Sequence, residues 1–318
     1  MIEINGLTKR FGPIIAVSGL SLQVAKGEIL GFLGPNGAGK STTMKMVSGY
    51  LVPSAGTIRI LGHDIERETS AAQANIGYLP EGAPAYGDMT ARHFLRFIAE
   101  VRGYAGAGAR LRIEEAVSKT ELSGVLDQPI ETLSKGFKRR VGLAQAILHD
   151  PPVLIMDEPT DGLDPNQKHS VRTLLRTMAP EKAIIVSTHL LEEVEAVCTR
   201  AVIIDRGKIV ADGTPSELLA RSRYHNAVTV TLPSDQLESA KSALAPVPGV
   251  ASLEEVRRSD GSVQITALPK SGALLIESVA ALAAQRGWTV KEMYAEPGRL
   301  DDVFRSITTH DAAQAGNA

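Results

Sequence analysis

Residues 34–42 read GPNGAGKST, a segment with three glycines, a lysine and two hydroxyl side chains. An apolar run, residues 29–33, precedes it, and a stretch with a helical pattern follows. A glycine-rich turn between a strand and a helix directs backbone N–H groups and the helix N-terminus at an anion. Lys40 would reach the β- and γ-phosphates of a nucleotide, Ser41 would ligate Mg²⁺, and Thr42 would bond the α-phosphate. The predicted nucleotide-binding residues are Gly34, Asn36, Gly37, Ala38, Gly39, Lys40, Ser41 and Thr42.

A second apolar run, residues 153–156, ends in Asp157 and Glu158. The carboxyl ends of strands are where open α/β sheets bind ligands. Asp157 would hold Mg²⁺ directly or through water, and Glu158 would take the proton of an attacking water. An apolar run followed by two acids is by itself typical of an ordinary strand end. The phosphate loop on the same chain favours the catalytic interpretation.

Two further segments carry groups that suit a phosphate. The segment LSKGFKRRVGLAQAIL, residues 133–148, places Ser134 and Gly136 at the start of a helix, which is a second anion site. The segment STHLLEEV, residues 187–194, places His189 just after an apolar strand, where its imidazole could touch a γ-phosphate. A basic surface helix and a solvated histidine are the alternatives for the two segments taken singly.

The composition limits the kind of protein that can position these groups. A chain of 318 residues with 43% hydrophobic and 22% charged residues is long enough for two globular domains. A net charge of −2 argues against broad nucleic-acid binding, which needs a basic surface. The single cysteine, Cys198, excludes an internal disulfide and fits a reducing compartment. No window approaches the ~20 apolar residues of a membrane span, and the start lacks the pattern of a secretion signal. We therefore expect a cytoplasmic chain.

Strands alternate with helices up to about residue 220, which predicts a doubly wound α/β domain with a mostly parallel sheet. The glycine-rich residues 103–108 are predicted to form a loop. Beyond residue 223 the order is β-α-β-β-α-β, which predicts a small ferredoxin-like α+β domain. The predicted strands are 227–232, 250–257, 262–267 and 288–294, and the predicted helices are 235–244 and 271–286.

A last helix is predicted from the spacing of Leu300, Val303, Phe304 and Ile307. The small, polar residues after it indicate a disordered tail. The predicted organisation is therefore an ATPase-like domain over 1–221, an accessory domain over 222–310 and a tail over 311–318.

The order of these motifs resembles that of the ABC ATPases over about residues 1–220. The resemblance implies a P-loop fold of ABC type, with an antiparallel β subdomain and a helical subdomain. It implies that Phe11 stacks on adenine and that His189 is the switch histidine. Ser134 and Gly136 would contact the γ-phosphate held by the opposite subunit, and residues 161–164, with Asp164, would cross the interface. Two ATP molecules with Mg²⁺ would then lie in a head-to-tail dimer.

The chain departs from the usual family pattern at three positions. Lys135 replaces the first glycine of the signature, and Phe137 replaces its glutamine. Glu81 stands where the family often has a glutamine that reaches Mg²⁺, and a carboxylate can also ligate this ion. With the ending GRLDDVF, residues 298–304, these variants are similar to ATPases of second-type ABC exporters.

The resemblance implies an ATP-hydrolysing motor that drives a separate transmembrane permease and binds no nucleic acid. The second ATPase subunit is expected to be an identical chain, with a heterodimer as the alternative. The motor would be cytoplasmic and peripheral, held at the inner face of the cell membrane by the permease. Residues 82–105, with Tyr86, Met89 and Arg92, are predicted to form the groove for a cytosolic helix of that permease.

Other functions are weighed against this one. A soluble ABC protein acting on ribosomes or nucleic acid usually has two cassettes, coiled coils, zinc-binding cysteines or a basic arm, and this sequence shows none. An importer ATPase is disfavoured by Glu81 and the GRLDDVF ending. An inactive regulator is disfavoured because Lys40, Asp157, Glu158 and His189 are all present. The C-terminal domain is either a packing accessory or an element of dimerisation or regulation.

Overall fold

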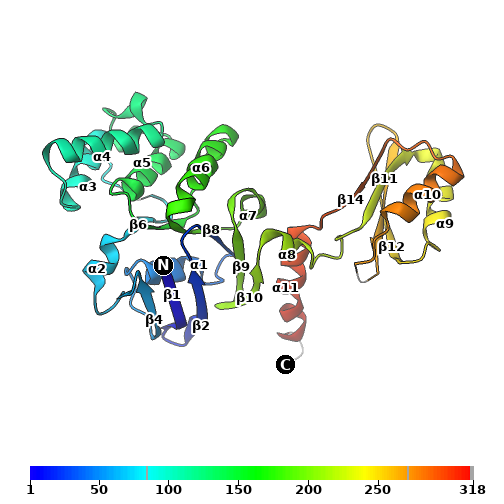
Figure 1. Cartoon of the computed structure of the whole chain (residues 1–318), viewed down its shortest axis with the longest axis horizontal. Coiled ribbons are helices and arrows are strands. Elements are labelled where there is room, and N and C mark those ends of the chain that lie inside the picture. The colour runs from blue at the N-terminus through cyan, green and yellow to red at the C-terminus, as the bar shows by residue number, and fades with distance from the viewer. Residues whose placement is uncertain (84, 271, 316–318) are drawn as a thin grey trace. The chain divides into compact units, whose positions relative to one another are not determined.

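The computed structural model describes residues 1–83, 85–270 and 272–315, with side chains to residue 308. Contacts divide the chain into two compact units, Met1–Asp212 and Gly213–Ala318 (Figure 1). The boundary between the two units thus lies at 212/213, on the N-terminal side of the domain boundary at 221/222 that the sequence predicts. Residues 311–315 of the predicted disordered tail belong to the last helix, and residues 316–318 lie outside the described residues. No helix in the described ranges is both long and apolar enough to cross a bilayer.

The first unit contains an antiparallel sheet, in the order β2-β1-β4-β5, and a six-stranded sheet, in the order β10-β9-β3-β8-β7-β6. In the second sheet β9, β3, β8, β7 and β6 run parallel. The strands are β1 (Ile2–Phe11), β2 (Ile14–Val24), β3 (Ile29–Leu33), β4 (Ala55–Ile60), β5 (His63–Asp64), β6 (Ile76–Leu79), β7 (Val153–Asp157), β8 (Ala183–Thr188), β9 (Arg200–Asp205) and β10 (Lys208–Gly213). The helices are α1 (Lys40–Val47), α2 (Thr69–Ala74), α3 (Ala91–Val101), α4 (Gly106–Lys119), α5 (Lys135–Ile147), α6 (Pro165–Met178) and α7 (Leu191–Val197).

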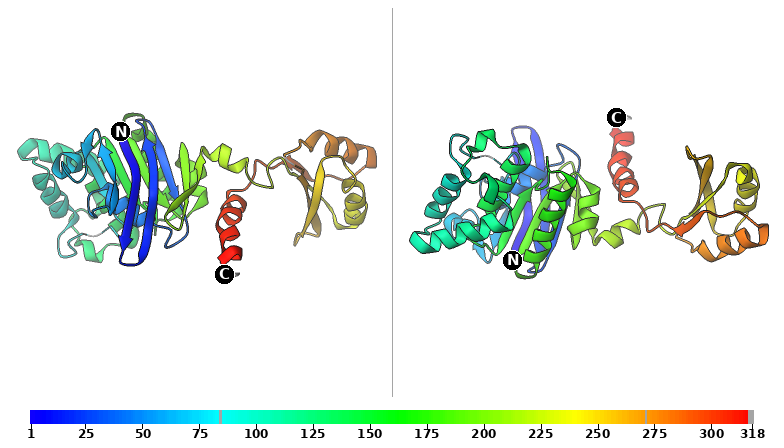
Figure 2. Two further views of the ribbon diagram at one scale, coloured as in Figure 1. Left: turned by 90° about the horizontal axis from the view of Figure 1, so that it is seen from below. Right: turned by 90° about the horizontal axis from the view of Figure 1, so that it is seen from above.

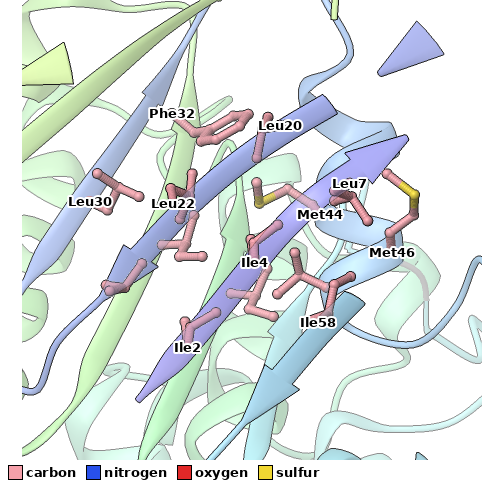
Figure 3. Close-up of a cluster of buried hydrophobic side chains, with 14 of the residues drawn as sticks. Ile2, Ile4, Leu7, Leu20, Leu22, Leu30, Phe32, Met44, Met46 and Ile58 are labelled. Atoms are coloured by element: carbon pink, nitrogen blue, oxygen red, sulfur yellow. The ribbon is translucent and has the colours of Figure 1, made fainter. Parts of the chain in front are cut away.

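One hydrophobic cluster joins the two sheets around α1 (Figure 3). Alternate residues of β1, such as Ile2 and Ile4, point into it, as does Phe32 of β3. Met44 and Met46 of α1 are fully buried in the same cluster. Strand β3 is buried along its whole length, as its continuous apolar run predicts. The helix that follows the phosphate loop is therefore fixed against both sheets.

Helices α3, α4 and α5 pack together at one end of this unit (Figure 1). The prediction of a loop over 103–108 is confirmed for residues 103–105 and was wrong for residues 106–108, because α4 begins at Gly106. Ala109, Ala116 and Val117 of α4 are buried. The burial of these side chains offsets the low helix propensity of glycine, which costs about 1 kcal/mol per residue relative to alanine.

The second unit contains a four-stranded antiparallel sheet in the order β12-β13-β11-β14, which confirms the ferredoxin-like topology. Helices α9 and α10 pack on one face of this sheet (Figure 2). Helix α10 begins later than predicted, because Gly272 has a φ of +71°, outside the right-handed helical region. The strands are β11 (Val228–Pro233), β12 (Val250–Arg257), β13 (Ser262–Pro269) and β14 (Glu292–Ala295). The helices are α8 (Pro215–Leu219), α9 (Leu237–Leu244), α10 (Ile276–Arg286) and α11 (Leu300–Ala315).

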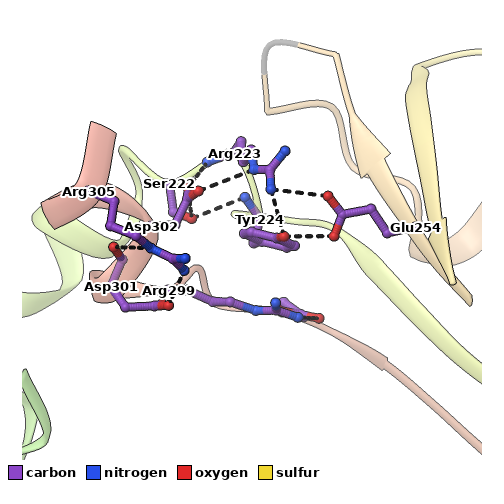
Figure 4. A network of polar contacts seen from close by, with 9 residues as sticks. Ser222, Arg223, Tyr224, Glu254, Arg299, Asp301, Asp302 and Arg305 are labelled. Atoms are coloured by element: carbon purple, nitrogen blue, oxygen red, sulfur yellow. Dashed lines mark hydrogen bonds and ion pairs between the residues drawn. The ribbon is translucent and has the colours of Figure 1, made fainter. Parts of the chain in front are cut away.

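A polar network within this second unit joins α11 and β12 to the segment that follows α8 (Figure 4). Asp302 accepts hydrogen bonds from Ser222 at 2.8 Å and from Arg223 at 3.1 Å. Glu254 accepts one from the Tyr224 hydroxyl at 2.7 Å. The Arg299 guanidinium lies 3.7 Å from the centre of the Tyr224 ring. The last helix also packs against α8, with Leu300 and Val303 buried.

Candidate nucleotide site

The loop after β3 has the backbone of a phosphate cradle. Gly37 and Gly39 have φ angles of +81° and +104°, which L side chains rarely adopt. A Cβ on Gly39 would lie 2.5 Å from the Ala16 carbonyl oxygen, and one on Gly34 would lie 2.4 Å from that of Ile204. Helix α1 then begins at Lys40, with Gly39 as its N-cap and Ser41 and Thr42 in its first turn. The glycines are thus required by geometry, and the free N–H groups of the helix start belong to the loop.

Lys40 is buried, and its ammonium donates hydrogen bonds to the Gly34 and Pro35 carbonyls at 2.7 and 3.1 Å. Burial lowers the pKa of this ammonium, and the charges of Glu158, Asp157 and Glu81 oppose that shift. These acids lie at or just beyond the carboxyl ends of β7 and β6, at the same edge of the sheet as the carboxyl end of β3. The structure therefore brings the lysine and the three predicted carboxylates together.

Glu158 and His189 meet across the ends of β7 and β8. The Nδ1 atom of His189 lies 2.9 Å from Oε1 of Glu158. The carboxylate is mostly buried, with 19% of the side chain exposed, whereas the imidazole is 49% exposed. Asp157 is fully buried and accepts a hydrogen bond from Ser187 on one oxygen, while its Oδ2 has no hydrogen-bond partner. This edge therefore presents a carboxylate oriented by an imidazole beside a carboxylate with a free oxygen.

The other predicted group lies at the starts of α5 and α6. Ser134 caps α5 by accepting a hydrogen bond from the Phe137 N–H at 3.3 Å. A Cβ on Gly136 would lie 2.6 Å from the Gln167 side-chain oxygen, so the start of α5 lies close to the start of α6. Asp164 caps α6, accepting from the Gln167 N–H at 2.9 Å. The starts of α5 and α6 are thus in contact with each other.

The unusual Lys135 has a place in this arrangement. Its ammonium lies 2.8 Å from the Asp161 carboxylate, and this contact holds the pKa of Asp161 below its usual range. The side chain of Lys135 also covers Gly162, where a Cβ would come within 2.5 Å of its Cδ. The pair is exposed and worth little by itself. Its effect is to connect the start of α5 with the segment that precedes α6.

Phe11 ends β1, with 47% of its surface exposed and Lys9 Nζ 5.2 Å from its ring centre. The stacking of adenine on this ring stays a prediction.

Arg139 was not singled out from the sequence. It lies on α5, is 5% exposed, and donates hydrogen bonds to the Asp157 and Glu158 carbonyls. It also donates to the Pro80 carbonyl at 2.9 Å. The sequence does not indicate this role, because the partners of Arg139 are backbone carbonyls, which every residue has.

The chain is similar to known proteins over up to 97% of its length. The family model described as ABC transporter matches residues 17–161. A Nod factor export ATP-binding protein I of Paraburkholderia xenovorans (strain LB400) is 41% identical over 69% of this chain and 72% of the relative. The linearmycin resistance ATP-binding protein LnrL of Bacillus subtilis (strain 168) is 31% identical over 97% of this chain and 98% of the relative.

Solved structures agree with this similarity. An ATP-binding subunit of an ABC transporter superposes with a TM-score of 0.64 at 30% identity, over 69% of this chain and 91% of its own. A dimeric cassette bound to ADP and Pi has a TM-score of 0.63 at 23% identity, over 68% of this chain and 99% of its own, and supports the fold alone. The phosphate loop, the paired acids and these relatives lead to one conclusion: the chain belongs to the ABC transporter family, as an ATP-binding and ATP-hydrolysing subunit.

Proposed function

We propose that this ATPase is the motor of an exporter, working as a dimer of identical chains on a separate transmembrane permease. The observation that carries the catalytic part is the 2.9 Å contact between Glu158 and His189, beside the buried ammonium of Lys40. A base, an orienting imidazole and a phosphate-binding cation are the groups that ATP hydrolysis needs.

In this proposal Glu158 accepts the proton of the water that attacks the γ-phosphate. Its carboxylate is largely shielded from solvent and is in contact with His189. The imidazole has enough exposure to touch the γ-phosphate through its other nitrogen. Lys40 would exchange its carbonyl contacts for β- and γ-phosphate oxygens and neutralise charge there. Phe11 would stack on the adenine ring.

The residues present fit a Mg²⁺ ion. Asp157 is a buried carboxylate whose Oδ2 has no hydrogen-bond partner, which is unusual unless a ligand completes it. Hard cations of this kind bind oxygen ligands, and few of these come from protein when phosphates supply the others. Ser41, Asp157 and Glu81 would hold the ion. When bound, it would neutralise charge on the β- and γ-phosphates.

The placement of the two predicted groups on different elements supports a dimer. Lys40, Glu158 and His189 lie at one sheet edge, whereas Ser134 and Gly136 lie at the start of α5. One chain supplies each group once. If Ser134 and Gly136 close on the ATP held by a second chain, each of two sites becomes complete, as in a head-to-tail pair.

This arrangement predicts that specific ATPase activity depends on protein concentration. Because each complete site needs two chains, activity per chain should rise as the purified chain is concentrated and then level off. Steady-state phosphate release with Mg²⁺, measured over a dilution series, tests this. Activity per chain that stays constant down to dilutions where light scattering shows only monomer would contradict the shared site.

A groove of about 930 Å³ in the first unit supports the permease contact. It lies between the parallel sheet and α3. Tyr86, at its rim, is 54% exposed and makes edge-on contacts with Phe94 and Phe97 at 6.3 and 5.7 Å. Its aromatic lining suits the apolar face of an amphipathic helix. Met89 is half-buried and does not line the groove, so its predicted exposure was wrong. Arg92 is exposed as predicted, but it pairs with Asp127 and does not line the groove either. The other groove-lining aromatic residues are Tyr50, Tyr78 and Tyr104.

Cysteine crosslinking tests this docking site. Val101 lines the groove and is 66% exposed, so Val101→Cys should crosslink to a cysteine in a cytosolic helix of the co-expressed permease. Val210→Cys, exposed on β10, is the matched control and should not. The native Cys198 should not form a crosslink, because burial raises the pKa of its thiol to about 12. The groove assignment would be wrong if an intact complex gave no crosslink at position 101.

The relatives support the direction of transport. Two of them are named for Nod factor export and for linearmycin resistance. We infer that this chain also powers export, and that it works on the cytoplasmic side, at the inner face of the membrane, where its permease holds it.

A further inference from the structure

Arg139 lies on α5, and its side chain connects the carboxyl ends of two strands, β6 and β7. Its Nη1 donates to the Pro80 carbonyl at 2.9 Å, beyond the end of β6. Its Nη2 donates to the carbonyls of Asp157 and Glu158, at the end of β7. The guanidinium thus holds the backbone on both sides of the site, next to Glu81 and at the two acids themselves.

Burying the charge of Arg139 costs free energy, so the need to fill space in the core does not explain why an arginine is present. Arg139 is 5% exposed, and burial lowers the pKa of its guanidinium. The negative charges of Asp161, Asp157 and Glu158 oppose this shift. An apolar side chain of similar size would fill the space without that cost. A planar fork with donors on two sides is what three separate carbonyls require.

The backbone that Arg139 holds is unusual at Glu158. This residue has a φ of +52°, in the left-handed region that costs a non-glycine residue about 1 kcal/mol or more. Its N–H donates to the Ser187 carbonyl at 3.0 Å, and its own carbonyl accepts from Arg139 and from the Asp161 N–H. Since backbone conformation sets the direction of a side chain, these bonds determine where the Glu158 carboxylate points.

We propose that Arg139 is a positioning residue that keeps Glu158 in this left-handed conformation and couples it to the signature helix α5. Ser134, which would engage the partner's ATP, is the N-cap of the same helix, five residues before Arg139. A shift of α5 on ATP binding would therefore be transmitted through Arg139 to the base and to the backbone before Glu81. This inference rests on the proposed role of Glu158 as general base.

The test separates positioning from folding. Arg139→Lys keeps the charge but cannot reach three carbonyls, so kcat of the full-length chain should fall about 10²-fold, as expected for a base displaced by about 1 Å. The KM for ATP should change less than about twofold, because ATP contacts are made elsewhere. For Arg139→Ala, added ethylguanidinium should restore part of kcat, whereas ethylammonium should not.

Arg140→Lys is the matched control. Arg140 is the next residue of α5, is also buried, and pairs with Glu121 at 2.9 Å, away from the strand ends. The kcat of the Arg140→Lys chain should stay near that of the parent protein. A folded Arg139→Lys chain with parental kcat would overturn the proposal, as would parallel losses of kcat, ATP affinity and Tm. If Arg139→Ala does not fold, Arg139→Lys decides alone. The Glu158→Gln variant is measured in the same series. If it still hydrolyses ATP, Glu158 is not the general base, and the proposed function fails together with the role of Arg139 that rests on it.

Discussion

Glu158→Gln is expected to bind ATP but to hydrolyse it about 10²- to 10⁴-fold more slowly, the usual contribution of a general base. Glutamine keeps the shape of the side chain and its reach to His189, yet it cannot take the proton of the attacking water. The phosphate loop is unchanged, so ATP should remain trapped and the dimer should persist. Light scattering with ATP and Mg²⁺ should show the doubled mass, and phosphate release should show the lost turnover.

A second substitution in the same background identifies the interface. Ser134→Asp retains a good N-cap for α5, because aspartate caps as well as serine. It also places a carboxylate where the γ-phosphate of the partner's ATP would bind. The ATP-dependent dimer should therefore disappear while the fold persists. Glu181→Gln, made in the parent chain at an exposed acid paired with Lys26, is the control for the Glu158→Gln change and should hydrolyse ATP normally. A Glu158→Gln chain that stays monomeric with ATP would remove the homodimer from the proposal.

The parts of the site that follow from sequence are those in which neighbours along the chain are neighbours in space. The loop 34–42 is one continuous turn, and Asp157 and Glu158 end one buried strand. Parallel strands bring their carboxyl ends together, so His189 was predicted at the same edge as Glu158. Their contact at 2.9 Å depends on the left-handed backbone of Glu158, which residue types do not reveal.

Other features arise from tertiary contacts that local patterns do not contain. Gly106 begins a helix because α4 packs against α3 and α5, although its composition favours a loop. Strand β9 was overlooked although its sequence is apolar, and it lies beside β3 in the sheet. Arg139 reads as one more cation on a basic helix, yet the fold buries it against three carbonyls.

Lys40→Met is expected to weaken ATP binding about 10- to 100-fold, since hydrogen bonds to charged groups contribute about 1.5–3 kcal/mol each. Methionine fills the buried space but leaves Glu158, Asp157 and Glu81 without the cation they surround, so their charge would repel the phosphates. Lys45→Met, an exposed lysine on the same helix α1, is the matched control and should bind ATP as the parent protein does. Titration calorimetry with ATP and Mg²⁺ measures both variants, with Tm confirming that each is folded. An affinity for ATP that is equal in the two variants would mean that Lys40 serves the loop's own carbonyls and not the nucleotide.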